Sequence, residues 1–207
     1  MVATFRKIVL YSVVLCGSFC SAASPAYARG PTASAHKLEP LDRVRKVVPE
    51  PINLRAVQAE DRMRRAQGEP YRFAIPRRVT INPLDDGTWE DIDDETWVWR
   101  LRISAPGAQS LNLGFTRFNM PKGTELFIYS VDGEDILGPF TDRYNEGHGQ
   151  LWTPVVLSDD IVVELTIPAS AIEKLELELT SINHGYRGFE ESGLEKSGYC
   201  NIDVACP

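Results

Sequence analysis

The chain has 207 residues, of which 43% are hydrophobic and 25% charged; this composition is typical of a soluble globular protein and excludes a largely disordered one. Its formal net charge of -7 argues against a nucleic-acid partner, because phosphate binding needs concentrated lysine and arginine. Residues 29–83 hold 12 basic against 6 acidic side chains and residues 84–195 hold 7 against 22, so the two segments are expected to lie against each other, to face different partners, or to be ordinary solvated surfaces.

The first 28 residues have the pattern of a secretory signal peptide. Two basic residues precede an apolar run, Ile8–Phe19, and Ala26-Tyr27-Ala28 then supplies the small-x-small pattern that signal peptidase accepts. We predict cleavage after Ala28, with an earlier cut near Ala22 or Ala23 as the alternative. The apolar run is short for a membrane span, and no later segment reaches the ~20 apolar residues of a membrane helix. The sequence therefore predicts a secreted or periplasmic protein with no membrane association after cleavage.

The cysteines lie in two groups at the two ends of the chain. Cys16 and Cys20 would leave with the signal peptide, and neither follows the small residue that lipid attachment requires. Cys200 and Cys206 stand in the last eight residues. A bond between these two would close a small loop and stabilise little of a core, so we expect their disulfide partners outside this chain.

Residues 29–70 are predicted to form a basic segment with one short helix. Residues 29–52 are rich in proline, alanine and charge, which favours an extended, mobile segment. Asn53 is a good N-cap and Gly68 a good stop, which predicts a helix over about 53–67. An alanine-rich apolar stripe should face a partner, because a helix this short is marginal alone. Its members are Ala56, Ala59, Met63 and Ala66, and Arg62, Arg64 and Arg65 make the other side basic.

From Tyr71 onward the hydrophobic period changes to two, which predicts β-strands. Alternating segments lie at 97–104, 111–115, 126–130, 161–167 and 175–181, and turn signals stand at 106–107, 121–123, 132–133, 147–149 and 158–160. Roughly eight to ten strands without intervening helices indicate an antiparallel β-sandwich, jelly-roll-like, over 71–189. The expected core comprises Trp97, Trp99, Leu101, Phe115, Phe127, Trp152, Val163 and Leu165, with one or two of these on the wrong face.

No catalytic residue is predicted within the chain. It contains no Gly-x-Ser-x-Gly elbow, and structural contacts are the favoured role for His36, His148 and His184. No pair of histidines has metal-ligand spacing, so no metal site and no cofactor are predicted. The aspartate-rich turns leave bound calcium as a less favoured alternative.

The final residues have the most specific pattern. Ser197-Gly198-Tyr199-Cys200-Asn201-Ile202-Asp203-Val204-Ala205-Cys206-Pro207 closely resembles the mature N-terminus of secreted bacterial lysyl endopeptidases, which are trypsin-like serine proteases. Segments such as 111–115, 126–130, 149–156 and 182–189 resemble the region ahead of their catalytic domain. The resemblance covers most of residues 54–207. It implies that both cysteines pair with positions further along that domain, and that the chain is a pre-pro region with the first mature residues attached, as a truncated frame or a fragment.

The resemblance also suggests a maturation site and a partner. Residues 190–196 form a polar linker, and a lysine-specific protease could cut between Lys196 and Ser197 to release itself. The implied function is a non-catalytic pro-domain that assists folding of a trypsin-like catalytic domain in cis or restrains its activity. The alternatives are a secreted β-sandwich module that binds carbohydrate, cell surface or substrate, and, less favoured, an independent enzyme.

Overall fold

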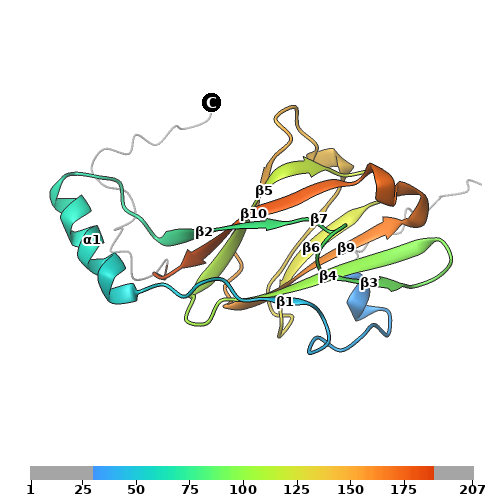
Figure 1. The fold of residues 1–207 in the computed structure, drawn as a ribbon, viewed down its shortest axis with the longest axis horizontal. Coiled ribbons are helices and arrows are strands. Elements are labelled where there is room, and N and C mark those ends of the chain that lie inside the picture. Colours follow the sequence, from blue (N-terminus) through green and yellow to red (C-terminus); the bar gives the residue numbers. More distant parts are fainter. Residues whose placement is uncertain (1–29, 189–207) are drawn as a thin grey trace, which may run out of the picture.

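Two β-sheets face each other across an apolar core in the computed structural model, which describes residues 30–188, and one helix lies at the end of the sandwich (Figure 1). The elements are η1 (Thr32–Ser34), β1 (Lys46–Val47), α1 (Leu54–Ala66), β2 (Ala74–Ile81), β3 (Thr88–Asp91), β4 (Thr96–Ser104), β5 (Ser110–Asn119), β6 (Glu125–Ser130), β7 (Ile136–Phe140), η2 (Asp142–Tyr144), β8 (Leu151–Trp152), β9 (Asp160–Pro168), η3 (Ala169–Lys174) and β10 (Glu176–Gly185). The six-stranded sheet has the order β1-β4-β9-β6-β7, with β3 also paired to β4, and the four-stranded sheet has the order β2-β10-β5-β8. All pairs are antiparallel except the parallel pair of β1 and β4.

The predicted fold class is confirmed: the chain is mostly β, with two antiparallel sheets and a short helix ahead of the larger strands. Each alternating segment of the sequence forms a strand, and the predicted turns separate them. Four of these turns have a glycine in the left-handed region; for example, Gly107 with φ 85° follows β4 and Gly133 with φ 76° follows β6.

A β-bulge in β10 changes which side chains face the core. The pairing of β10 shifts register between Leu179 and Ser181 against both of its neighbours. Because an extra residue reverses the alternation, Ile182 and His184 point inward after the bulge and both are buried. The alternation of apolar and polar residues in the sequence predicts a single regular strand over 175–181, and it did not predict this reversal.

Six of the eight predicted core residues are fully buried, whereas Trp97 is half-buried and Trp152 is 55% exposed. The assignment of Trp152 to the core is wrong. Its ring lies over Gly114 of the paired strand β5, where a Cβ atom would come within 2.4 Å of it. The missing side chain at Gly114 therefore lets the indole lie on the outside of the sheet.

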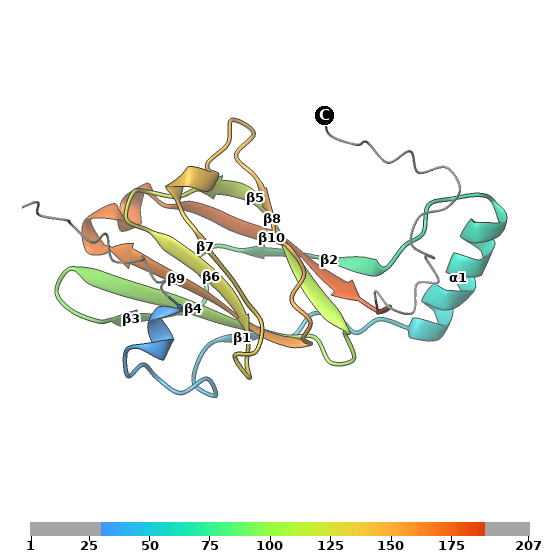
Figure 2. The ribbon, with the colours of Figure 1, turned by 180° about the vertical axis from the view of Figure 1, so that it is seen from behind.

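An N-terminal arm, residues 30–47, covers the outer face of the six-stranded sheet (Figure 2, blue). Val44 is buried, and Leu41 packs against a second apolar cluster formed by Phe127, Tyr129 and Val162. These contacts place Phe127 on the face opposite the main core. The packed arm differs from the mobile segment that its composition predicted, because the apolar residues that hold it lie in strands β6 and β9, far along the chain.

Polar side chains fasten the arm to the same face. Glu164 of β9 is fully buried and accepts hydrogen bonds from the Ala33 N–H at 3.2 Å and from the Tyr129 hydroxyl at 2.8 Å. The buried Arg100 guanidinium donates to the Glu39 carbonyl and pairs with Glu90. Burial raises the pKa of Glu164, although the hydrogen bonds from Tyr129 and the arm and the charge of Arg100 oppose this shift.

The raised pKa of Glu164 predicts a pH-dependent cost in stability. Between the unfolded value near 4.5 and the higher folded value, the native state binds more protons than the unfolded state, so this group lowers stability as pH rises through that window. We expect Glu164→Gln to remove this decline and to be at least as stable as the wild type at pH 7. Each unit of pKa shift removed corresponds to about 1.4 kcal/mol. Urea denaturation from pH 4 to 8 measures the free energy of unfolding, and Glu173→Gln at an exposed position is the control. A pH profile of Glu164→Gln that equals that of the wild type would contradict the expectation.

Candidate functional site

The helix α1 meets the sandwich where the last strand ends. Asn53 caps the helix by accepting the Ala56 N–H at 3.1 Å, and Gly68, at φ 74°, reverses the chain after its last turn. Residues 69–73 then lead into β2. The end of β10 lies alongside, because the Tyr186 N–H donates to the Phe73 carbonyl at 3.1 Å. The helix therefore meets the sandwich where β2 begins and β10 ends.

A single carboxylate, Asp61 of α1, is the centre of this junction and is 6% exposed. Its Oδ1 accepts the Arg72 guanidinium at 2.9 Å and its Oδ2 accepts the Arg187 guanidinium at 2.7 Å. The Tyr186 hydroxyl lies 2.7 Å from the same Oδ2 and 2.8 Å from the Arg72 carbonyl. We call these four residues the Asp61 junction.

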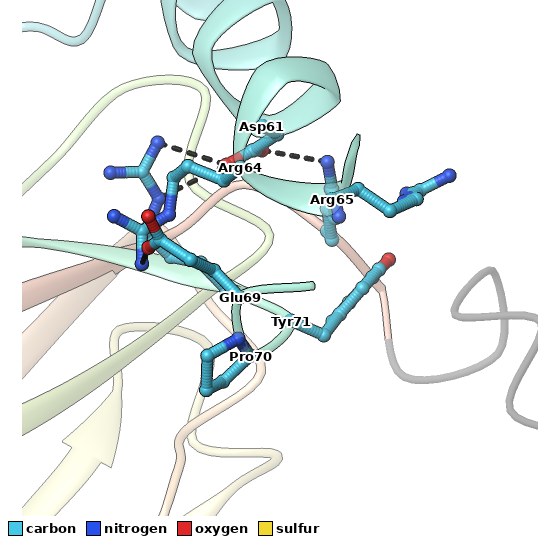
Figure 3. A pocket seen from close by; sticks show the side chains of 8 residues that line it. Asp61, Arg64, Arg65, Glu69, Pro70 and Tyr71 are labelled. Carbon is cyan, nitrogen blue, oxygen red and sulfur yellow. Dashed lines mark hydrogen bonds and ion pairs between the residues drawn. The ribbon is translucent and has the colours of Figure 1, made fainter. Parts of the chain in front are cut away.

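Further contacts order the arginines of the Asp61 junction. The Arg187 guanidinium lies over the Tyr71 ring at 4.5 Å and over the Tyr186 ring at 5.2 Å. Arg72 also pairs with Glu60 at 3.0 Å. Figure 3 shows Asp61 pointing from the helix into this cluster, above a small hollow of about 80 Å³.

The balance of charge makes Asp61 an ionised anchor. Burial by itself would raise the pKa of Asp61, but the hydrogen bonds from Tyr186 and Arg72 and the charges of Arg187 and Arg72 together lower it. The pKa of the Tyr186 hydroxyl is raised by burial and by its bond to the carboxylate, so this hydroxyl stays a donor. Of the two cations that face this carboxylate, Arg72 is shared with Glu60, whereas Arg187 pairs with Asp61.

The helix docks through a different face from the one that its sequence suggested. Asp61 is the one buried residue of α1, and Val57 and Arg64, four residues before it and three after, are half-buried. Three of the four members of the predicted alanine-rich stripe are exposed, namely Ala56, Ala66 and Met63, which is 64% exposed, and only Ala59 is half-buried. Sequence analysis missed Asp61, Arg72 and Arg187 as a group. The available signal was an acidic residue at helical spacing between Val57 and Arg64.

The predicted processing and disulfide residues lie outside the described residues 30–188; they are Ala28, Lys196, Ser197, Cys200 and Cys206. Their roles stay predictions. The chain leaves the described part at Gly188, directly after Arg187 of the Asp61 junction, eight residues before Lys196.

The three histidines lie apart from the Asp61 junction. His148 is exposed and pairs with Glu146 at 2.7 Å, while His184 is buried and burial lowers its pKa. Within residues 30–188, no hydrogen bond joins a serine hydroxyl to a histidine, and no cluster of three or more His, Cys, Asp or Glu has the geometry of a metal site. The same residues contain no helix long and apolar enough to cross a membrane.

A family model described as "Lysyl endopeptidase N-terminal domain" matches residues 47–186. The match begins in β1, includes α1 and both sheets, and ends at Tyr186. It therefore includes three of the four members of the Asp61 junction and most of the described chain.

We predict that a single substitution at Asp61 releases the helix α1 from the sandwich. Asp61→Asn removes the carboxylate that pairs with Arg187 and leaves Arg72 with only the more exposed Glu60, and we expect it to lower the free energy of local opening of α1 by about 2–4 kcal/mol. Hydrogen exchange of the α1 amides measures this loss, while amides of β4 and β9 should keep their protection. Because the pKa of Asp61 is lowered, its contribution to stability is present above the unfolded pKa of 3.8 and is lost as pH falls through the folded pKa.

The control for this experiment is Glu60→Gln on the same helix. Glu60 pairs with the same Arg72 but its side chain is 53% exposed, so the change should cost less than about 1 kcal/mol. Equal helix protection in Asp61→Asn and Glu60→Gln would refute the anchoring role of Asp61.

Proposed function

Since the chain belongs to the lysyl endopeptidase N-terminal domain family, we propose that it is a pro-region that binds a trypsin-like catalytic domain in cis and both assists its folding and restrains its activity. The observation that carries this proposal is the family match over the helix and both sheets. One interface accounts for both effects, because a partner that binds only the folded protease stabilises that state, and the stabilisation increases with its affinity. If the interface also occludes the substrate cleft, the same contact inhibits.

The arrangement of the chain supports a role before proteolytic maturation. The described domain ends at an anchored point, since Tyr186 and Arg187 are tied to α1 through Asp61. Residues 189–196 connect this point to the Lys196–Ser197 bond, so we propose cleavage there as the step that separates the pro-region from the protease. Export through the signal peptide, with cleavage after Ala28, and disulfides from Cys200 and Cys206 to positions outside this chain belong to the same proposal. A folded domain of this kind needs no catalytic residue and no cofactor of its own.

The processing site is tested by sequencing the N-terminus of the mature product from the complete precursor. We expect it to begin at Ser197, and we expect Lys196→Gln to reduce maturation at least a hundredfold, on the order of 3 kcal/mol of lost transition-state binding. Lys174→Gln, in η3 of the folded domain, is the matched control and should mature normally. A mature product that starts at another residue, or normal maturation of Lys196→Gln, rejects the site.

The action on the protease is tested by adding the purified chain to a lysyl endopeptidase catalytic domain. We expect a severalfold higher yield of activity from the denatured domain and inhibition of lysyl-amide hydrolysis by the native domain. Leu165→Asp, which introduces a charge into the buried core, is the control and should lose both effects. If the chain changes neither refolding nor activity but is retained on cell-wall polysaccharide, the binding-module alternative replaces the proposal.

A further inference from the structure

Two hollows share part of their lining, which is formed by the last turn of α1 and the residues after it. The first, of about 80 Å³, is lined by Asp61, Arg65, Glu69 and Arg187, and the second, of about 350 Å³, extends to Asn112 and Asn183 of the four-stranded sheet. Four residues line both hollows: Arg64, Pro70, Tyr71 and Arg72. Together with Arg65, which lines the first hollow, we call them the basic ledge. Figure 3 shows Arg64, Pro70 and Tyr71 beside the first hollow.

The basic ledge offers positive charge and apolar surface that the described residues do not cover. Arg65 forms no ion pair with a carboxylate in residues 30–188, and its guanidinium lies 5.9 Å from the Tyr71 ring. Arg64 pairs with Glu69, but its Nε is buried without a hydrogen-bond partner in this part of the chain. Tyr71 is 39% exposed. A segment that combines carboxylates with an apolar side chain would complement this surface.

The chain itself continues from this place. Arg187 lines the first hollow, and Gly188, the last described residue, follows it directly. An extended segment of eight residues spans at most roughly 28 Å, so residues 189–196 reach both hollows from Gly188. These residues carry three glutamates, one lysine and the apolar Phe189 and Leu194.

We propose that residues 189–196 bind along the basic ledge, with Glu190 and Glu191 paired to Arg64 and Arg65, and that this docking shields the Lys196–Ser197 bond from proteases in trans. The inference rests on the proposed maturation cut after Lys196 and adds a regulation to it. A protease must draw several residues on each side of the cut into an extended conformation. The docked segment must therefore leave the ledge first, and the cleavage rate follows the population of the undocked form.

The test measures cleavage after Lys196 in the full chain by a limiting amount of an added lysine-specific protease, read by mass spectrometry. We expect Arg64→Glu/Arg65→Glu and Glu190→Arg/Glu191→Arg each to be cut about tenfold faster than the wild type, since like charges then oppose docking. The variant that carries all four changes restores opposite charges and should return to the slow rate. Glu190 and Glu191 lie six and five residues before Lys196, so their substitution leaves the residues next to the cut unchanged.

Controls separate docking from unfolding and from the proposed function. Arg55→Glu/Arg62→Glu makes the same change of charge on α1 away from the hollows and should be cut at the wild-type rate. The melting temperature of each variant, followed by circular dichroism, reports whether the sandwich is destabilised. Wild-type rates in both double variants, or a fast rate in the fourfold variant, would overturn the proposal. Because the protease is added, this result does not depend on whether the chain acts on a catalytic domain.

Discussion

The carboxylate of Asp61 determines where the helix meets the sandwich. A charge with so little exposure costs several kcal/mol in lost hydration, and it is tolerated because two guanidinium groups and a hydroxyl converge on it. The pairing runs against the overall distribution of charge, since Asp61 belongs to the basic segment and Arg187 to the acidic one. The basic segment is thus joined to the acidic segment through one of its few acidic residues, which pairs with one of the few basic residues of the other.

The β-sandwich could be predicted from sequence because period-two alternation directly reflects a sheet with one buried face. The same rule failed where both faces are covered. Arg100 and Glu164 occupy positions that normally face water, yet the N-terminal arm buries them, and no local pattern reveals a cover that comes from more than 60 residues away. The prediction for Trp152 was wrong for the opposite reason. An aromatic residue is expected in the core, but Gly114 has no side chain and lets the indole pack on the outer surface of the sheet.

The helix could be located from its cap and its stop signal, but its docking face could not be predicted. Hydrophobic periodicity gave most weight to the alanines and Met63, whereas the helix is held by a charged residue whose partners come from the β2 approach and from the end of β10. An ionic anchor leaves no periodic signal. Its consequence for function is that the apolar and basic parts of α1 face outward at the place where the linker begins, which suits a surface that has to bind something temporarily.

The N-terminal arm also determines the order in which the domain can be completed. The Thr32 and Thr166 hydroxyls are 2.6 Å apart although 134 positions separate them in the chain. Contacts so distant in sequence form slowly, because a long loop must close before they contribute. During synthesis the arm is made first, but its binding surface on β9 follows only when most of the domain has been made. The arm should therefore be the last large segment to fold onto the domain, and its packing indicates that the strands beneath it have already formed.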